Sequence, residues 1–149
     1  MNKLNLLGLG LAAAAMGVAA PAMAGTCPAD QVGPNALAGA PTKGKDVTDT
    51  VIGAVDLGPE IKVDGRSLRL RMLVVQPGGV VPLHSHVDRP ALIMTASGTM
   101  TEYRSSCMVP IVHTGGEVAQ ESGGISHWWK NTGDTVAILY SADVHNDKK

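Results

Sequence analysis

Short stretches in which apolar and polar residues alternate run through the chain from about residue 50 onward. The clearest covers 67–75, where Leu68, Leu70 and Met72 take alternate positions and Arg69 and Arg71 lie between them. Successive side chains of a strand point to opposite faces, so this pattern predicts a half-buried antiparallel strand. By the same criterion we expect about nine short strands, over 50–57, 67–75, 80–86, 91–97, 99–105, 109–112, 117–120, 126–131 and 135–142.

Glycine and proline separate these stretches. Gly58-Pro59 and the run Gln-Pro-Gly-Gly at 76–79 are expected to be turns, because proline restricts φ and glycine permits positive φ. No stretch after residue 44 shows a sustained helical period. Many short strands divided by such turns indicate an all-β sandwich or barrel. The chain has no phenylalanine, so its core must be largely aliphatic, and the pair Trp128 and Trp129 is conspicuous.

The first 24 residues differ from the rest. Lys3 precedes an apolar run over 4–20, and Ala22-Met23-Ala24 is a small-x-small cleavage site. This predicts a secretory signal peptide over 1–24 and a secreted protein, in the simplest case one of the bacterial periplasm. A retained membrane helix would need stop-transfer charges, and a lipid anchor at Cys27 would need a different sequence before it. We therefore expect no stable membrane insertion once the signal is removed.

The remaining residues are enough for one domain with one core. We expect an irregular arm over 25–44, rich in Pro, Gly and Ala, then a single barrel over 45–145 and a polar tail over 146–149. The net charge is −1, or about −2 without Lys3. With no basic stripe to displace counterions from phosphates, the sequence argues against a nucleic-acid partner.

The chain has two cysteines, Cys27 and Cys107. In an exported protein a disulfide is the default for such a pair, and it would tether the arm to the barrel. Two free thiols, or Cys107 as a metal ligand or redox group, are the alternatives.

Two histidines, His84 and His86, are the main candidates for chemistry. They are separated by one residue in a predicted strand, so both would point to one face, close enough to hold one metal ion. A third donor must come from another strand, and His127 is the obvious candidate. The sequence therefore predicts a metal site of three imidazoles.

The spacing around these histidines resembles the two motifs of the cupins. Gly78, the pair His84 and His86, and Gly98 match the first motif, while Gly116, the run 122–124, His127 and Asn131 match the second. The resemblance covers essentially the whole of 45–142. It implies a double-stranded β-helix, the jelly-roll barrel, with a metal held near its mouth.

The sequence departs from the cupin pattern at one ligand. Cupins usually place a metal-binding glutamate four or five residues after the second histidine, and here those positions are Pro90 and Ala91. Three-histidine cupins exist among iron-dependent thiol and diketone dioxygenases, so this loss does not abolish a site. The metal could be Fe, Zn, Cu, Mn or Ni, since all accept imidazole.

Four other residues could belong to the site. Glu102 or Glu121 could supply the missing carboxylate, or both could be surface glutamates, and an error of one residue in register reverses the answer. Arg89 could bind an anionic substrate or pair with Asp88 or Asp64. Trp129 could line the pocket, or one Trp could pack the core and the other cover an outer face. The remaining histidines, His113 and His145, fall outside the motifs and are expected at the surface or in hydrogen bonds.

These features suggest three kinds of function. The first is an exported metal-dependent cupin, an oxidoreductase resembling dioxygenases that acts on a small molecule through open metal positions. The second is a non-catalytic periplasmic module that binds a small molecule or metal. The third is a structural protein that uses its outer sheet, and a homodimer is compatible with all three.

Overall fold

The structure is a computed structural model that describes residues 25–148, so the predicted signal peptide lies outside the described residues. Within this range the chain forms eight strands and two short helical turns. The elements are η1 (Ala29–Gln31), β1 (Lys45–Asp56), α1 (Leu57–Ile61), β2 (Arg66–Ser85), β3 (Ala91–Ser97), β4 (Thr99–Arg104), β5 (Ile111–Thr114), β6 (Val118–Glu121), β7 (Ser126–Asn131) and β8 (Ala137–Asn146). No helix in this part of the chain has the length and apolar character of a membrane span.

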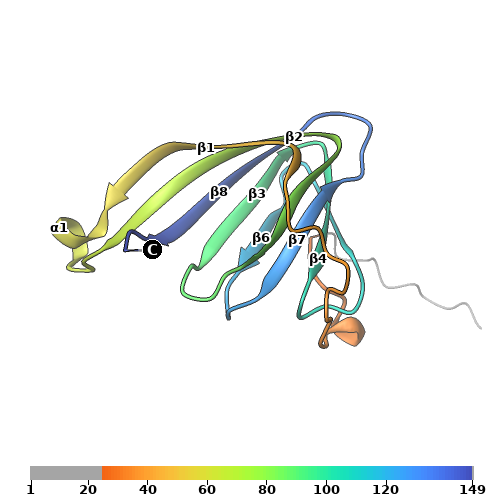
Figure 1. Ribbon diagram of the computed structural model, residues 1–149, viewed down its shortest axis with the longest axis horizontal. Coiled ribbons are helices and arrows are strands. Elements are labelled where there is room, and N and C mark those ends of the chain that lie inside the picture. The colour runs from red at the N-terminus through yellow and green to blue at the C-terminus, as the bar shows by residue number, and fades with distance from the viewer. Residues whose placement is uncertain (1–24, 149) are drawn as a thin grey trace, which may run out of the picture.

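All eight strands belong to one antiparallel sheet that curls into a nearly closed barrel (Figure 1). Its order is β5-β4-β7-β2-β8-β3-β6, and β1 pairs with the first part of β2. The two ends of this order, β5 and β6, are consecutive in the chain. The backbone of Thr95 in β3 bonds to Gly116 and Glu117 in the turn between them. The prediction of an all-β jelly-roll barrel is confirmed.

The predicted turn at 76–79 is wrong. These residues remain inside the 20-residue strand β2, because Val75 pairs with Val47 of β1 while Val80 pairs with Lys45, two residues further along the same partner. The four residues between them bulge without reversing the chain. Gly78 has a φ of +74°, which glycine adopts at no steric cost.

The buried face of β2 is the one that carries the arginines. Leu68 and Leu70 are 44% and 42% exposed, whereas Leu73 and Val75, on the same face as Arg69 and Arg71, are 2% and 0% exposed. Alternation was therefore predicted correctly, but it did not show which face is inside. The arginines can turn inward because a buried aspartate, described below, pairs with them.

A short helix was also missed. The side chain of Asp56 accepts a hydrogen bond from the backbone N–H of Gly58 at 2.9 Å, which caps α1. Lys62, with a φ of 63°, ends it in the left-handed conformation. Gly58-Pro59 does not form a separate turn, because Pro59 lies in the first turn of a helix, where its missing N–H costs nothing. Figure 1 shows α1 at the far end of β1 and β2 from the barrel.

The arm at 25–44 runs along the loop between β4 and β5. Cys27 and Cys107 form a disulfide with Cα atoms 5.8 Å apart. Backbone hydrogen bonds from Gly33 to Ser106 and from Asn35 to Ser105 continue the contact. The structure thus has the predicted disulfide, and neither cysteine is left as a thiol for metal binding.

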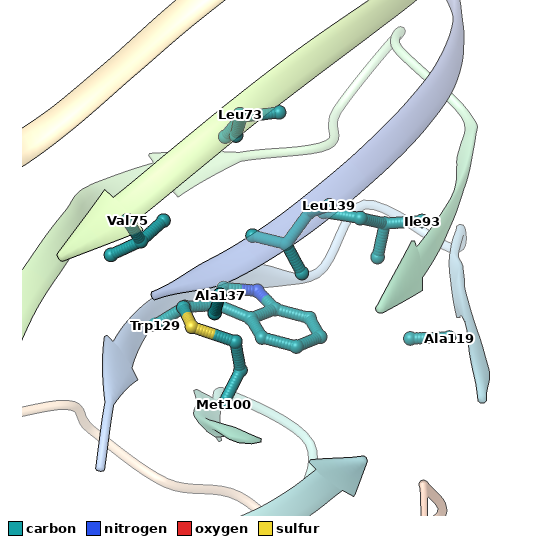
Figure 2. Packing of buried hydrophobic residues seen from close by; sticks show 8 residues of the cluster. All are labelled: Leu73, Val75, Ile93, Met100, Ala119, Trp129, Ala137 and Leu139. Carbon is teal, nitrogen blue, oxygen red and sulfur yellow. The ribbon is translucent and has the colours of Figure 1, made fainter. Parts of the chain in front are cut away.

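One end of the barrel interior is apolar. The buried cluster draws residues from six strands: Leu73, Val75, Ile93, Met100, Ala119, Trp129, Ala137 and Leu139. The indole of Trp129 lies in the middle of the cluster (Figure 2). Trp128 faces the other way and stacks on Tyr103 with ring centroids 4.0 Å apart. The expectation that one Trp packs the core and the other covers an outer face is met.

Candidate metal centre

The three histidines meet at one point inside the barrel. His84 of β2 and His127 of β7 are directly paired in register, and His86 follows one residue after the end of β2. The ring centroids lie 5.0 Å apart for His84 and His86, 4.6 Å for His84 and His127, and 4.8 Å for His86 and His127. One ring nitrogen of each lies within 4.8 Å of the others. Strand pairing thus brings the third imidazole to the first two.

The rings of His84 and His86 are each held through Nδ1. The Nδ1 atom of His84 lies 2.8 Å from the carbonyl oxygen of Pro82, and that of His86 lies 2.8 Å from the carbonyl oxygen of Arg89. A carbonyl oxygen only accepts hydrogen bonds, so both Nδ1 atoms carry the proton. In a neutral imidazole the Nε2 atom then has a free lone pair.

His127 is held in the same way by a carboxylate. Its Nδ1 atom lies 2.5 Å from an oxygen of Glu102. The indole nitrogen of Trp129 lies 3.2 Å from the same Nδ1 atom, and two N–H donors cannot share one hydrogen bond. The shorter contact decides for a proton on Nδ1, because a carboxylate can only accept. In the neutral imidazole the Nε2 atom of His127 then also has a free lone pair.

With all three imidazoles neutral, the three Nε2 atoms face one another through their lone pairs. Those of His84 and His127 are 3.1 Å apart, and that of His86 is buried with no hydrogen-bond partner. Burial, with repulsion from His127, lowers the pKa of His84 to about 3, and burial lowers the pKa of His86 to about 4. Three neutral lone pairs directed to one place are a donor set that a divalent transition metal fits.

Glu102 supports this cluster from behind. It is fully buried, and its second oxygen accepts from Nε2 of His113 at 3.1 Å, while Arg104 donates to its first oxygen at 2.7 Å. Burial alone would raise the pKa of Glu102, but the hydrogen bonds from His113 and His127 and the charge of Arg104 hold it well below its usual range. The alternative of a surface glutamate is wrong here, because three donors compensate the buried charge.

Glu121 lies on the other side of the cluster. It is 2% exposed, so the surface alternative is wrong for this residue as well. Its Oε2 atom lies 3.2 Å from Nε2 of His86, and its Oε1 atom lies 3.3 Å from Nε2 of His127. Burial raises the pKa of Glu121 to about 7, against a lowering by His127. The two glutamates that the sequence could not distinguish therefore have opposite environments.

A cavity of about 230 Å³ opens beside the histidines at the barrel mouth. Its wall includes His84, Glu121 and Trp129, together with the charged groups of Arg71 and Arg89. Trp129 thus contributes to both the core and the cavity. The volume suits a small molecule.

Arg89 pairs with a residue that sequence reasoning missed. Its guanidinium lies 3.2 Å from an oxygen of Asp143, a carboxylate on β8 that Arg69 also binds through two hydrogen bonds. The expected partner Asp88 is bound by Arg66. Asp143 lies just past the predicted last strand. The arginines on one face of β2 were the signal in the sequence that a buried carboxylate had to pair with them.

The two remaining histidines stay outside the cluster. His113 is buried and hydrogen-bonded to Glu102, and its ring lies 4.4 Å from that of Trp129. His145 pairs with Ser67 at the far part of β8. The candidate group of metal ligands among residues 25–148 contains neither.

Comparison with known proteins gives a short sequence match. No family model matches the chain. The auxin-binding protein ABP19b of Prunus persica is 32% identical over 81 residues, which are 52% of this chain and 39% of that protein. The chain therefore spans well under half the length of this curated relative.

Solved structures match more of the chain. A predicted oxalate decarboxylase from Thermotoga maritima has a TM-score of 0.56 at 17% identity, over 80% of this chain and 97% of that one. A structure of oxalate oxidase has a TM-score of 0.54 at 18% identity, over 70% of this chain and 54% of that one. These neighbours are cupin jelly-roll proteins. The chain has the cupin fold. At such identities the likeness shows the cupin architecture alone, and the chemistry must be argued from the site.

Proposed function

We propose that this cupin binds one divalent transition metal through Nε2 of His84, His86 and His127 and uses it in a reaction of a small molecule, as an oxidoreductase of the dioxygenase kind. The observation that carries the proposal is the set of three Nε2 lone pairs, each directed inward by a protonated Nδ1. An ion held there would act as a Lewis acid on an oxygen atom of the substrate. Its identity among Fe, Zn, Cu, Mn and Ni stays open.

The residues of the chain prepare the cavity for such a substrate. Arg71 and Arg89 lie in its wall together with Asp49 and Glu121, and these polar groups favour a polar, oxygen-bearing molecule. Trp129 and Ile93 supply apolar wall and exclude water from the side of the core. Glu102, which binds Nδ1 of His127, holds that ring in one orientation.

Export is part of the proposal. The disulfide between Cys27 and Cys107 supports an oxidising compartment, and the signal-like sequence over 1–24 supports secretion, with the periplasm as the simplest destination. Expression with the leader, followed by fractionation and mass spectrometry of the mature N-terminus, tests both. An intact leader on a cytoplasmic product would contradict export.

Metal content is the first test of the site. We expect the purified protein to hold about one metal ion per chain, measured by elemental analysis after anaerobic and aerobic purification. The triple variant His84→Ala, His86→Ala, His127→Ala should hold none, whereas His145→Ala, which removes a histidine outside the cluster, should keep the wild-type content. Equal metal content in the triple variant and the wild type would refute the metal site.

A non-catalytic binding module remains the second candidate, and one observation favours it. The arginines of the cavity wall already have partners, since Arg71 binds Asp49 and Arg89 binds Asp143. This weakens the case that they hold a reacting substrate in place. Oxygen uptake by the iron-loaded protein with small diketones, thiols and flavonols separates the two functions. Sustained turnover would eliminate the binding module, and full metal content without turnover of any of them would favour it.

A further inference from the structure

Strand register places a carboxylate where the first cupin motif lacks one. Ala91 of β3 is one of the two positions, with Pro90, at which the motif usually has its glutamate, and it is buried, 7% exposed. Its direct partner across the β3–β6 pair is Glu121. Directly opposed residues of antiparallel strands point to the same face with Cβ atoms about 5 Å apart. Glu121 therefore reaches the same part of the barrel interior from the neighbouring strand.

The contacts of Glu121 fit a metal ligand better than a hydrogen-bonded side chain. Its oxygens lie 3.2 Å and 3.3 Å from the Nε2 atoms of His86 and His127. Despite that distance, Nε2 of His86 has no hydrogen-bond partner. When Glu121 is ionised, lone pairs of oxygen and nitrogen thus face each other in a buried place, and a shared cation would compensate this arrangement.

Glu102 cannot take this role. Its two oxygens accept from His113, His127 and Arg104, and it contacts His127 at Nδ1, on the side of the ring away from Nε2. A carboxylate saturated in this way supports a ligand and does not replace one.

We propose that Glu121 is the fourth ligand of the metal site, a carboxylate that β6 supplies in place of the one absent at positions 90 and 91. This inference rests on the proposed metal site and deepens it. Three nitrogens and one carboxylate oxygen give a complex with one less positive charge than three nitrogens alone. The hard oxygen raises the affinity for Mn(II), Fe(II) and Co(II) relative to Cu(II), which nitrogen donors already hold well.

The test is metal binding by the metal-free full-length mature protein. Mn(II) and Cu(II) are titrated by calorimetry, and the visible spectrum of the Co(II) form reports the donor set independently of any activity. We expect Glu121→Gln to weaken Mn(II) binding by about 10- to 100-fold, to weaken Cu(II) binding less, and to change the Co(II) spectrum. Glu117→Gln, at the turn before β6, should behave as the wild type.

A second variant moves the carboxylate across the strand pair. In the double variant Ala91→Glu, Glu121→Ala the new glutamate enters the space vacated at 121, so we expect Mn(II) affinity and the Co(II) spectrum to return toward those of the wild type. This variant also measures the role of the carboxylate if Glu121→Gln fails to fold.

The outcomes distinguish this inference from the function on which it rests. Wild-type Mn(II) affinity and an unchanged Co(II) spectrum in Glu121→Gln would overturn the fourth ligand and leave the three-histidine site intact. Weaker binding with an unchanged Co(II) spectrum would also overturn it, because the donor set would then be the same. Absence of metal binding in the wild type would overturn the metal site and the fourth ligand together.

Discussion

Two buried glutamates flank His127, and they differ in what surrounds their oxygens. Glu102 on β4 accepts from His127, His113 and Arg104, and its pKa is lowered despite its burial. Glu121 on β6 meets only the ring nitrogens of His86 and His127 in its ion-pair contacts, and burial raises its pKa to about 7. The ionised form of Glu102 is compensated by its three donors, whereas ionising Glu121 in the metal-free protein is costly. Two carboxylates on opposite sides of one imidazole are therefore expected to have different roles.

Replacing Glu102 should have the largest effect. In Glu102→Gln the charge that Arg104 and two histidines share is lost, and removing one partner of a buried ionic network typically costs about 3–5 kcal/mol. We expect a loss of that size in the free energy of unfolding of the metal-free protein, measured by urea denaturation. A variant as stable as the wild type would mean that the network is not a support.

Replacing Glu121 should stabilise the metal-free protein, whereas replacing Glu102 should destabilise it. The folded state keeps this proton up to about pH 7, while the ordinary value is 4.5, so ionisation of the unfolded chain destabilises the wild type as pH rises through that window. Glu121→Gln removes the effect. We expect its stability relative to the wild type to increase from pH 4.5 to 7, by up to about 3 kcal/mol, in urea melts at several pH values. A difference that stays constant with pH would contradict the raised pKa.

Removing one donor from Glu102 should have an intermediate effect. His113→Asn takes away the hydrogen bond to the carboxylate, and a hydrogen bond to a charged group contributes about 1.5–3 kcal/mol. The loss should appear in thermal and urea unfolding, while His145→Asn, on the far part of β8, should change little. Equal losses in the two variants would show that the Glu102 network is not special.

The smallest effect is expected at Trp129. Its indole N–H approaches the same Nδ1 atom that Glu102 binds, and the proton on Nδ1 already bonds to the carboxylate. Trp129→Phe should therefore cost about 1–2 kcal/mol of packing and leave Mn(II) affinity unchanged. A large loss of affinity would instead give the indole a share in orienting His127.

Much of the fold could be predicted because it depends on local pattern. Alternation placed most of the strands, and the paired motifs indicated the barrel. The errors occurred where residues far along the chain determine the local structure or the buried face. The glycines and the proline of 76–79 predict a turn. Pairing with β1 on both sides of this run keeps the strand continuous. The sequence predicts that the arginine face of β2 is exposed. It is buried because Asp143, at least 70 residues further along the chain, pairs with Arg69 and Arg71.

The candidate site also contains residues that local sequence predicts and residues whose roles depend on distant strands. The two-residue spacing of His84 and His86, and the match of His127 to the second motif, are local properties, and they were enough to predict three imidazoles at one place. The roles of Glu102 and Glu121 depend on strand register, and a shift of one residue would reverse the face of either side chain. The pairing of Ala91 with Glu121, together with the contacts of Glu121 to His86 and His127, shows which carboxylate faces the three Nε2 atoms.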